Sequence, residues 1–249
     1  MSMLDGKTVL ITAAAGTGIG FATALRCAEE GARVMISDRH PRRTSEAAQR
    51  LAETTGSVVP HVRCDVTDQD QVDAMFAAAI HELGHIDVLV NNAGLGGTAT
   101  VVDMPDEQWH RVLDVTLTGT MRCTRAALQH MQPRASGTIV NNASVLGWRA
   151  QKGQSHYAAA KAGVMALTRC AALEAAEFGI RINAVAPSLA MHPHLHKVTS
   201  QQLLRELEAR EAFGRAATPR EIANVILFLA SDLSSYMTGE VISVSSQRA

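Results

Sequence analysis

Short apolar runs alternate along the chain with longer segments in which apolar residues recur every three or four positions. The apolar runs are rich in Val and Ile and end at Asn, Asp or Gly, which is typical of strands buried on both faces of a parallel sheet. We therefore predict strands at residues 7–12, 33–37, 58–64, 86–91, 138–143, 180–186 and 237–244.

The amphipathic segments between these runs are predicted helices. They cover residues 21–30, 43–54, 69–83, 109–131 and 219–231, and a further helix carries residues 157–161 and continues to residue 178. Regular alternation of strand and helix predicts an α/β fold with one doubly wound, Rossmann-like parallel sheet of about seven strands and helices on both faces. We expect a single domain over residues 1–249, with its active cleft at the carboxyl ends of the strands.

The composition of the chain limits which partners and which classes of function we expect. A net charge of −1 with interspersed acidic and basic residues argues against a nucleic-acid partner. No apolar run is long enough for a bilayer and the start lacks a secretion signal, so we expect no membrane partner and a cytoplasmic protein. The cysteines, Cys27, Cys64, Cys123 and Cys170, are widely spaced and are predicted to be buried core thiols, neither disulfides nor metal ligands.

A glycine-rich turn follows the first predicted strand. Gly16, Thr17, Gly18 and Ile19 precede a helix, where free backbone N–H groups and the helix dipole favour a pyrophosphate. Asp38 closes the second strand, where a carboxylate can accept hydrogen bonds from an adenosine ribose and repel an additional phosphate. This pattern favours NAD, although arginines 39, 42 and 43 leave NADP open.

Tyr157 and Lys161 are four residues apart in a helical segment, so they share one face. A phenol titrates near ~10, and a cation about 4 Å away at an effective dielectric of ~20 contributes roughly 4 kcal/mol, which predicts a phenol pKa of around 7. Ser144 precedes the tyrosine by thirteen residues, at the end of a predicted strand, where its hydroxyl can hold a carbonyl oxygen. A serine-hydrolase interpretation is rejected because Ser144 lacks the flanking glycines of a nucleophile elbow.

These residues, together with the glycine-rich turn and the quartet Asn91-Asn-Ala-Gly94, resemble the short-chain dehydrogenase/reductase family. The resemblance implies hydride transfer between a nicotinamide cofactor and an alcohol or ketone, with Tyr157 exchanging the proton, Lys161 lowering its pKa and binding the ribose, and Ser144 positioning the substrate. It also implies a homo-oligomer, a dimer or tetramer. The cofactor residues implied are Gly16, Thr17, Gly18, Ile19, Asp38, Asp65, Val66, Asn91, Ala93, Gly94, Tyr157, Lys161 and Pro187. Asp65 could instead act as a cap before the next helix.

Several positions depart from the family pattern. Ala13 replaces the first glycine of the turn, which has one additional residue and must bulge, and Thr116 replaces an asparagine, so the proton relay must be built differently or run more slowly. Ser188 and His192 replace a glycine and a threonine, and Ser245-Ser-Gln247 replaces Asp-Gly-Gly. These departures keep open a second hypothesis, a non-catalytic dinucleotide-binding regulatory module.

Residues 188–215 are predicted to form a substrate lid. His192, His194 and His196 alternate within it, but they have no acidic or cysteine partner nearby, so no metal is predicted. Trp148 and Arg149 are candidate substrate contacts, the alternatives being a packed tryptophan and a surface arginine. Residues 141–151, 156–161 and 244–249 are similar to those of actinobacterial reductases of hydroxy-indane acyl-CoA intermediates in sterol-ring degradation, which implies an acyl-CoA substrate. An NADPH-dependent 3-oxoacyl-[acyl-carrier-protein] reductase is the alternative.

Overall fold

The computed structural model describes residues 2–191 and 201–246. Within them, seven strands form one sheet in the order β3-β2-β1-β4-β5-β6-β7, and every neighbouring pair is parallel. The strands are β1 (Thr8–Ile11), β2 (Arg33–Asp38), β3 (His61–Arg63), β4 (Val88–Asn91), β5 (Gly137–Asn142), β6 (Ile180–Pro187) and β7 (Val241–Val244). The predicted doubly wound, Rossmann-like sheet is confirmed.

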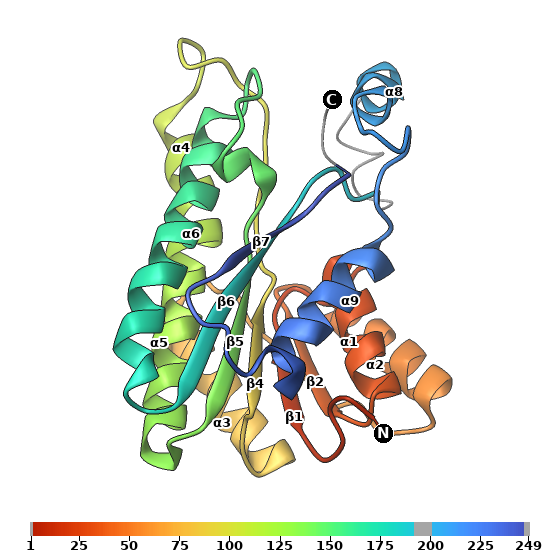
Figure 1. Ribbon diagram of the computed structural model, residues 1–249, viewed down its shortest axis with the longest axis vertical. Helices are drawn as coiled ribbons and strands as arrows, with labels where there is room; N and C mark the ends of the chain where they lie inside the picture. Colours follow the sequence, from red (N-terminus) through yellow and green to blue (C-terminus); the bar gives the residue numbers. More distant parts are fainter. Residues whose placement is uncertain (1, 192–200, 247–249) are drawn as a thin grey trace.

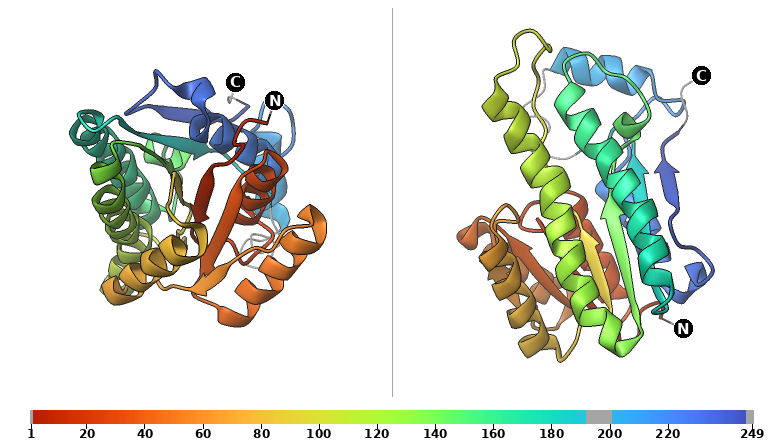
Figure 2. Two further views of the ribbon diagram at one scale, coloured as in Figure 1. Left: turned by 90° about the horizontal axis from the view of Figure 1, so that it is seen from below. Right: turned by 90° about the vertical axis from the view of Figure 1, so that its left-hand side faces the viewer.

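Helices cover both faces of the sheet, as Figures 1 and 2 show. One face carries α1 (Ile19–Glu29), α2 (Pro41–Thr55) and α9 (Pro219–Ala230), and the other carries α3 (Gln69–Leu83), α5 (Gly119–Met131) and α6 (Ser155–Ala176). Two further helices, α4 (Asp106–Leu113) and α8 (Gln201–Ala209), lie at the edge where the strands end. In the described part of the chain, no helix is long and apolar enough to cross a membrane.

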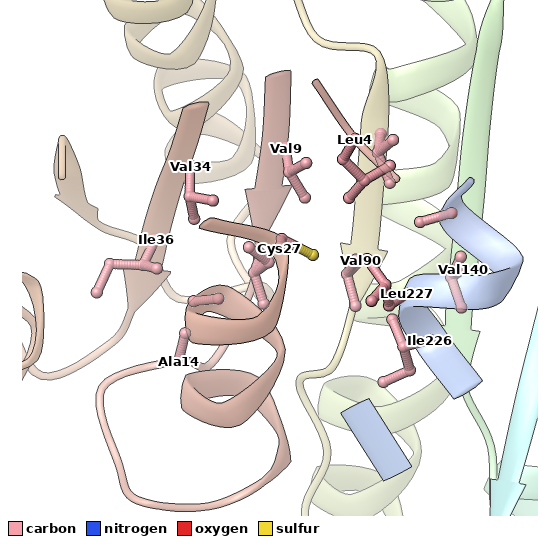
Figure 3. Packing of buried hydrophobic residues seen from close by; sticks show 14 of the residues in the cluster. Leu4, Val9, Ala14, Cys27, Val34, Ile36, Val90, Val140, Ile226 and Leu227 are labelled. Atoms are coloured by element: carbon pink, nitrogen blue, oxygen red, sulfur yellow. The ribbon is translucent and has the colours of Figure 1, made fainter. Parts of the chain in front are cut away.

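The packing of the core explains why the strands are continuous apolar runs in the sequence. Val9 and Ile11 of β1 pack in the cluster beneath α1 and α9 (Figure 3), whereas Leu10 between them packs in the cluster beneath α3 and α5. Successive side chains of a strand point to opposite faces, so a sheet covered on both sides needs apolar residues at every position. The strand order reverses between β1 and β4, which opens a crevice at their carboxyl ends.

Several predicted boundaries were wrong. The third strand is limited to His61–Arg63 because it is an edge strand paired only with β2, and Val58 is 90% exposed. The predicted helix over 109–131 begins earlier, at Asp106, and a π-helical turn, Asp114–Thr118, separates α4 from α5. Cys170 is exposed on α6, contrary to the prediction, whereas the other three cysteines are buried.

The glycine-rich turn contains a strained residue. Ala13 has a φ of 53°, in the left-handed region where a Cβ crowds the backbone, and its carbonyl accepts a hydrogen bond from Asn92 Nδ2 at 3.0 Å. The position where the family has glycine therefore keeps a glycine-like conformation.

We expect Ala13→Gly to raise the free energy of unfolding by roughly 0.5–1 kcal/mol, because glycine takes this φ without steric cost. Urea unfolding at equilibrium measures the change. The control is Ala150→Gly, since Ala150 is exposed and outside the left-handed region, and there the same change should destabilise. Destabilisation by Ala13→Gly would contradict the assignment of strain.

Candidate active site

The carboxyl end of β5 and the first turns of α6 bring three side chains together. Ser144 follows β5 and begins a short 3₁₀ turn (Val145–Gly147), in which its Oγ accepts a hydrogen bond from Leu146 N at 3.2 Å. Tyr157 and Lys161 lie one turn apart on α6, and the Lys161 Nζ is 5.5 Å from the centroid of the phenol ring. The Ser144 side chain lies near enough to the phenol to lower its pKa.

Lys161 is held in place by the backbone of β5. Its side chain is 3% exposed, and its Nζ donates a hydrogen bond to the carbonyl oxygen of Asn142. Gly94 lies on the other side of the ammonium, where an added Cβ would be 3.4 Å from Nζ. Gly94, which follows β4, therefore packs directly beside the ammonium.

The predicted acidification of the phenol was wrong. Burial raises the pKa of Tyr157 from 10.0 to about 12, and the nearby Ser144 side chain opposes this increase without cancelling it. Burial also lowers the pKa of Lys161 from 10.5 to about 8. The sequence argument assumed a solvated pair, whereas desolvation outweighs the attraction between the two groups here. At neutral pH, the protein alone holds a neutral phenol beside an ammonium.

The glycine-rich turn and the end of β4 form a second part of the site. Gly18 is the N-cap of α1, and no side chain bonds to the free N–H groups of that helix end. Gly20 permits a close approach, since a Cβ there would lie 2.6 Å from Asn92 Nδ2 and 2.7 Å from the Ala13 carbonyl oxygen. Gly16 and Thr17 are exposed on the turn, and Ile19 is half-buried.

Asp38 faces this turn from the end of β2. Its Oδ2 accepts a hydrogen bond from Ala15 N at 3.4 Å, and its Oδ1 accepts one from His40 N at 3.1 Å. The nearby arginines are engaged in part, since Arg39 Nε contacts His40 Nε2 and Arg42 pairs with Glu46. The carboxylate is therefore positioned beside the glycine-rich turn.

Two other predicted cofactor residues, Asp65 and Asn91, use their side chains for hydrogen bonds within the protein. Asp65 Oδ1 accepts hydrogen bonds from the backbone and side chain of Thr67, while Asp68 caps α3, so Asp65 stabilises its own turn and does not cap the helix. Asn91 is buried, and its Nδ2 donates to Thr124 and Asn141, which connects β4 to α5 and β5. Its side chain therefore stabilises the sheet. The remaining three lie at strand ends, with Val66 and Pro187 buried and Ala93 half-buried.

Three residues that were not among the predicted site residues organise the site, and one of them, Asn92, belongs to the quartet Asn91-Asn-Ala-Gly94. The Thr12 hydroxyl accepts hydrogen bonds from the backbone N–H groups of Asn92 and Ala93, and Asn142 Nδ2 donates to Asn92 Oδ1 at 3.0 Å. These contacts connect the ends of β1, β4 and β5. A polar residue at the end of one predicted strand and next to the ends of two neighbouring ones was the available signal.

Comparison with known proteins identifies the family to which this chain is related. The sequence model of the family described as enoyl-(acyl carrier protein) reductase matches residues 13–246. A Mycobacterium tuberculosis protein named (5R,7aS)-5-hydroxy-7a-methyl-1-oxo-2,3,5,6,7,7a-hexahydro-1H-indene-carboxyl-CoA reductase is 62% identical over 246 residues, 98% of this chain and 94% of the relative. A crystal structure of a short chain dehydrogenase from Mycobacterium smegmatis covers 100% of this chain and 95% of its own, at 59% identity and a TM-score of 0.89. NAD⁺-bound xylitol dehydrogenase matches with a TM-score of 0.92 and 32% identity over 98% of this chain and 99% of that one.

This chain belongs to the short-chain dehydrogenase/reductase family. As a member, it is an oxidoreductase that acts on CH–OH groups with NAD or NADP. The hypothesis of a non-catalytic binding module is therefore set aside.

The described residues fit the family's nicotinamide dinucleotide. The N-terminal end of α1, the glycines of the turn and the carboxylate of Asp38 line one edge of the crevice, and Gly94 lies beside Lys161. Backbone N–H groups suit a pyrophosphate and a carboxylate suits ribose hydroxyls. A cofactor bound there would extend from Asp38 to the Tyr157 and Lys161 pair.

Thr116, where family members usually have asparagine, lies in the π-helical turn and is fully buried. Its Oγ1 accepts a hydrogen bond from Leu95 N at 3.0 Å and donates to the Leu95 carbonyl oxygen at 3.3 Å. The hydroxyl therefore fixes the segment after β4. Both hydrogen-bonding roles of this hydroxyl are used within the protein, which leaves it poorly suited to a proton relay.

The predicted substrate contacts are less defined. Trp148 is 52% exposed beside the site, so it is not a packed core residue. Arg149 is half-buried, and its Nη1 is buried without a hydrogen-bond partner in the described structure. His192, His194 and His196 lie outside the described residues.

Burial of the lysine predicts a measurable pH dependence of stability. Because the folded pKa is about 8 and the ordinary value is 10.5, the unfolded chain binds more protons between these values, so stability rises with pH across that window. Relative to Lys161→Met, the wild type should gain roughly 3 kcal/mol between pH 7 and pH 11. Urea unfolding of both proteins across this range measures the difference. Lys152→Met removes an exposed lysine and should show no such trend.

Proposed function

We propose that this protein reduces a ketone on an alicyclic, acyl-CoA-linked substrate with NADH, and catalyses the reverse oxidation at the same site. The observation that carries the chemistry is the convergence of Ser144, at the end of β5, with Tyr157 and the buried ammonium of Lys161 on α6, where Nζ is 5.5 Å from the centroid of the phenol ring. The substrate class is supported by the 62% identity to the indene-carboxyl-CoA reductase of M. tuberculosis.

Tyr157 acts as the general acid in this proposal. The pKa of about 12 keeps its proton in place at neutral pH, which is the form needed to protonate a carbonyl oxygen as hydride reaches the carbon. Bound NADH supplies that hydride. The resulting phenolate would be stabilised by the Ser144 hydroxyl and by the ammonium of Lys161.

Ser144 and Lys161 have distinct roles. The Ser144 Oγ is positioned by Leu146 N and lies near the phenol, so a carbonyl oxygen placed between the two hydroxyls would accept a hydrogen bond from each. Lys161 carries its charge below pH 8, and the Asn142 carbonyl oxygen accepts a hydrogen bond from one of its three N–H groups. The remaining protons are available to the nicotinamide ribose and to the reacting phenolate.

The assay for this proposal follows nicotinamide absorbance with NADH and an oxo-indene-carboxyl-CoA of the kind named for the M. tuberculosis relative. Acetoacetyl-CoA and an acetoacetyl acyl-carrier protein, each with NADH and NADPH, test the 3-oxoacyl alternative. Faster turnover of either 3-oxoacyl thioester would overturn the alicyclic assignment. No absorbance change with any substrate would overturn the proposed chemistry.

Removal of the phenol hydroxyl tests the general acid. Tyr157→Phe should lower kcat about 100-fold or more, because the proton donor is lost, and should leave NADH affinity within about twofold. Stopped-flow reduction and fluorescence titration of NADH measure the two quantities. The chain has one other tyrosine, the fully exposed Tyr236, and Tyr236→Phe should change neither. Retained turnover in Tyr157→Phe would remove this residue from its role.

We further propose that NAD is preferred over NADP. The support is the Asp38 carboxylate beside the glycine-rich turn, where a 2′-phosphate would meet a like charge. Asp38→Ala should reduce the preference for NADH over NADPH, measured as a ratio of kcat/KM values, at least about tenfold. An unchanged ratio would contradict this assignment. The expected homo-oligomer and cytoplasmic location remain predictions.

A further inference from the structure

A buried carboxylate lies outside the catalytic trio. Glu211 follows α8 and is 5% exposed, in a segment that is otherwise mostly accessible. Over residues 201–215, which the structure describes throughout, only the side chains of Leu204 and Glu211 are buried. The buried side chains of this stretch are therefore one apolar residue and one acid.

The acid connects three separate parts of the chain. Glu211 Oε2 accepts a hydrogen bond from Ser188 Oγ at 3.3 Å and another from Ser246 Oγ at 2.9 Å. Ser188 directly follows β6 and Ser246 follows β7, and their strands are adjacent and parallel. Two of the departures from the family pattern, at 188 and 246, thus meet on one oxygen atom.

Backbone contacts close the base of the same segment. Ala217 N donates to the Leu189 carbonyl oxygen at 2.8 Å, and Met191 N donates to the Ala217 carbonyl oxygen at 2.9 Å. Figure 1 shows α8 above the carboxyl ends of the strands, at the same edge as the loop that follows β5. The Glu211 contacts therefore lie between this base and α8.

The chemistry of the contact argues for positioning. Burying a carboxylate is unfavourable unless hydrogen bonds compensate, and an apolar residue could anchor α8 without that cost. A carboxylate that accepts hydrogen bonds from two hydroxyls, in contrast, fixes the orientation of the segment as well as its distance from the strands. An acid at this position therefore selects one arrangement of α8 relative to β6 and β7.

We propose that Glu211 is a positioning residue, which with Ser188 and Ser246 fixes the segment 201–217 as a wall of the substrate cleft. This inference rests on the proposed function, because it assigns the segment to substrate binding. Ser188 follows Pro187, one of the predicted cofactor residues, so the same contact connects the substrate wall to the cofactor side of the cleft.

Kinetics of the full-length protein test the proposal. Glu211→Gln preserves size but removes the charge, and it should raise KM for the acyl-CoA substrate about tenfold while kcat changes less than about twofold. The paired variant Ser188→Ala with Ser246→Ala should give a similar increase. Adding Glu211→Gln to that pair should cause no further increase, because the three side chains act as one unit.

The matched control is Glu206→Gln. Glu206 is an exposed acid on α8 that accepts a hydrogen bond from Gln202 of the same helix, and its substitution should leave KM unchanged. Multiplicative effects of the three substitutions would overturn the proposal. An unchanged KM with a lowered unfolding midpoint would also overturn it, since that result describes a structural role only.

A second measurement needs no activity. Hydrogen exchange should become faster over residues 201–217 in Glu211→Gln and in the milder Ser246→Ala, and remain unchanged in α1, α6 and the central strands. Unchanged exchange over 201–217 in both variants would overturn the positioning role. If the wild type reduces no substrate but the two variants show this exchange pattern, the proposed function fails. The positioning role of Glu211, Ser188 and Ser246 then still holds.

Discussion

The burial of Lys161 constrains the rest of the site. An ammonium that is 3% exposed loses most of its hydration, and the Asn142 carbonyl that replaces part of it belongs to the last residue of β5. The ends of β5 and α6 must therefore be fixed relative to each other for the charge to be tolerated. Ser144 and Tyr157 belong to these same two elements, so the arrangement that holds the cation also brings the hydroxyls close together.

The cofactor side depends on a related arrangement of strand ends. Thr12, Asn92 and Asn142 end or follow β1, β4 and β5, and hydrogen bonds among them keep the three ends in register. This register places the glycine-rich turn next to the segment that carries Gly94. The strained backbone at Ala13 is tolerated because Asn92 binds its carbonyl oxygen. Strain in the turn is thus stabilised by a contact from another strand.

The sequence predicted the fold well where the physical signal is local. Continuous apolar runs identified strands such as Val88–Asn91 because a sheet covered on both faces needs apolar residues at every position. The helical spacing of Tyr157 and Lys161 likewise predicted their shared face. The π-helical turn at Thr116 was missed because the apolar period continues through it, and the phenol pKa was wrong because the burial of both groups depends on elements distant in sequence.

The least predictable part is the segment that we propose as a wall of the substrate cleft. Residues 201–215 show a helical pattern with many charges, so the sequence alone predicts that Glu211 is one more solvated acid. Its contacts with Ser188 and Ser246, which follow two separate strands, are visible only in the structure. A family's reaction can be inferred from residues that contact one another in every member, because proton and hydride transfer impose that geometry. Substrate choice depends on contacts specific to this chain, and Ser188 and Ser246 illustrate how residues outside the family pattern acquire a shared role only in three dimensions.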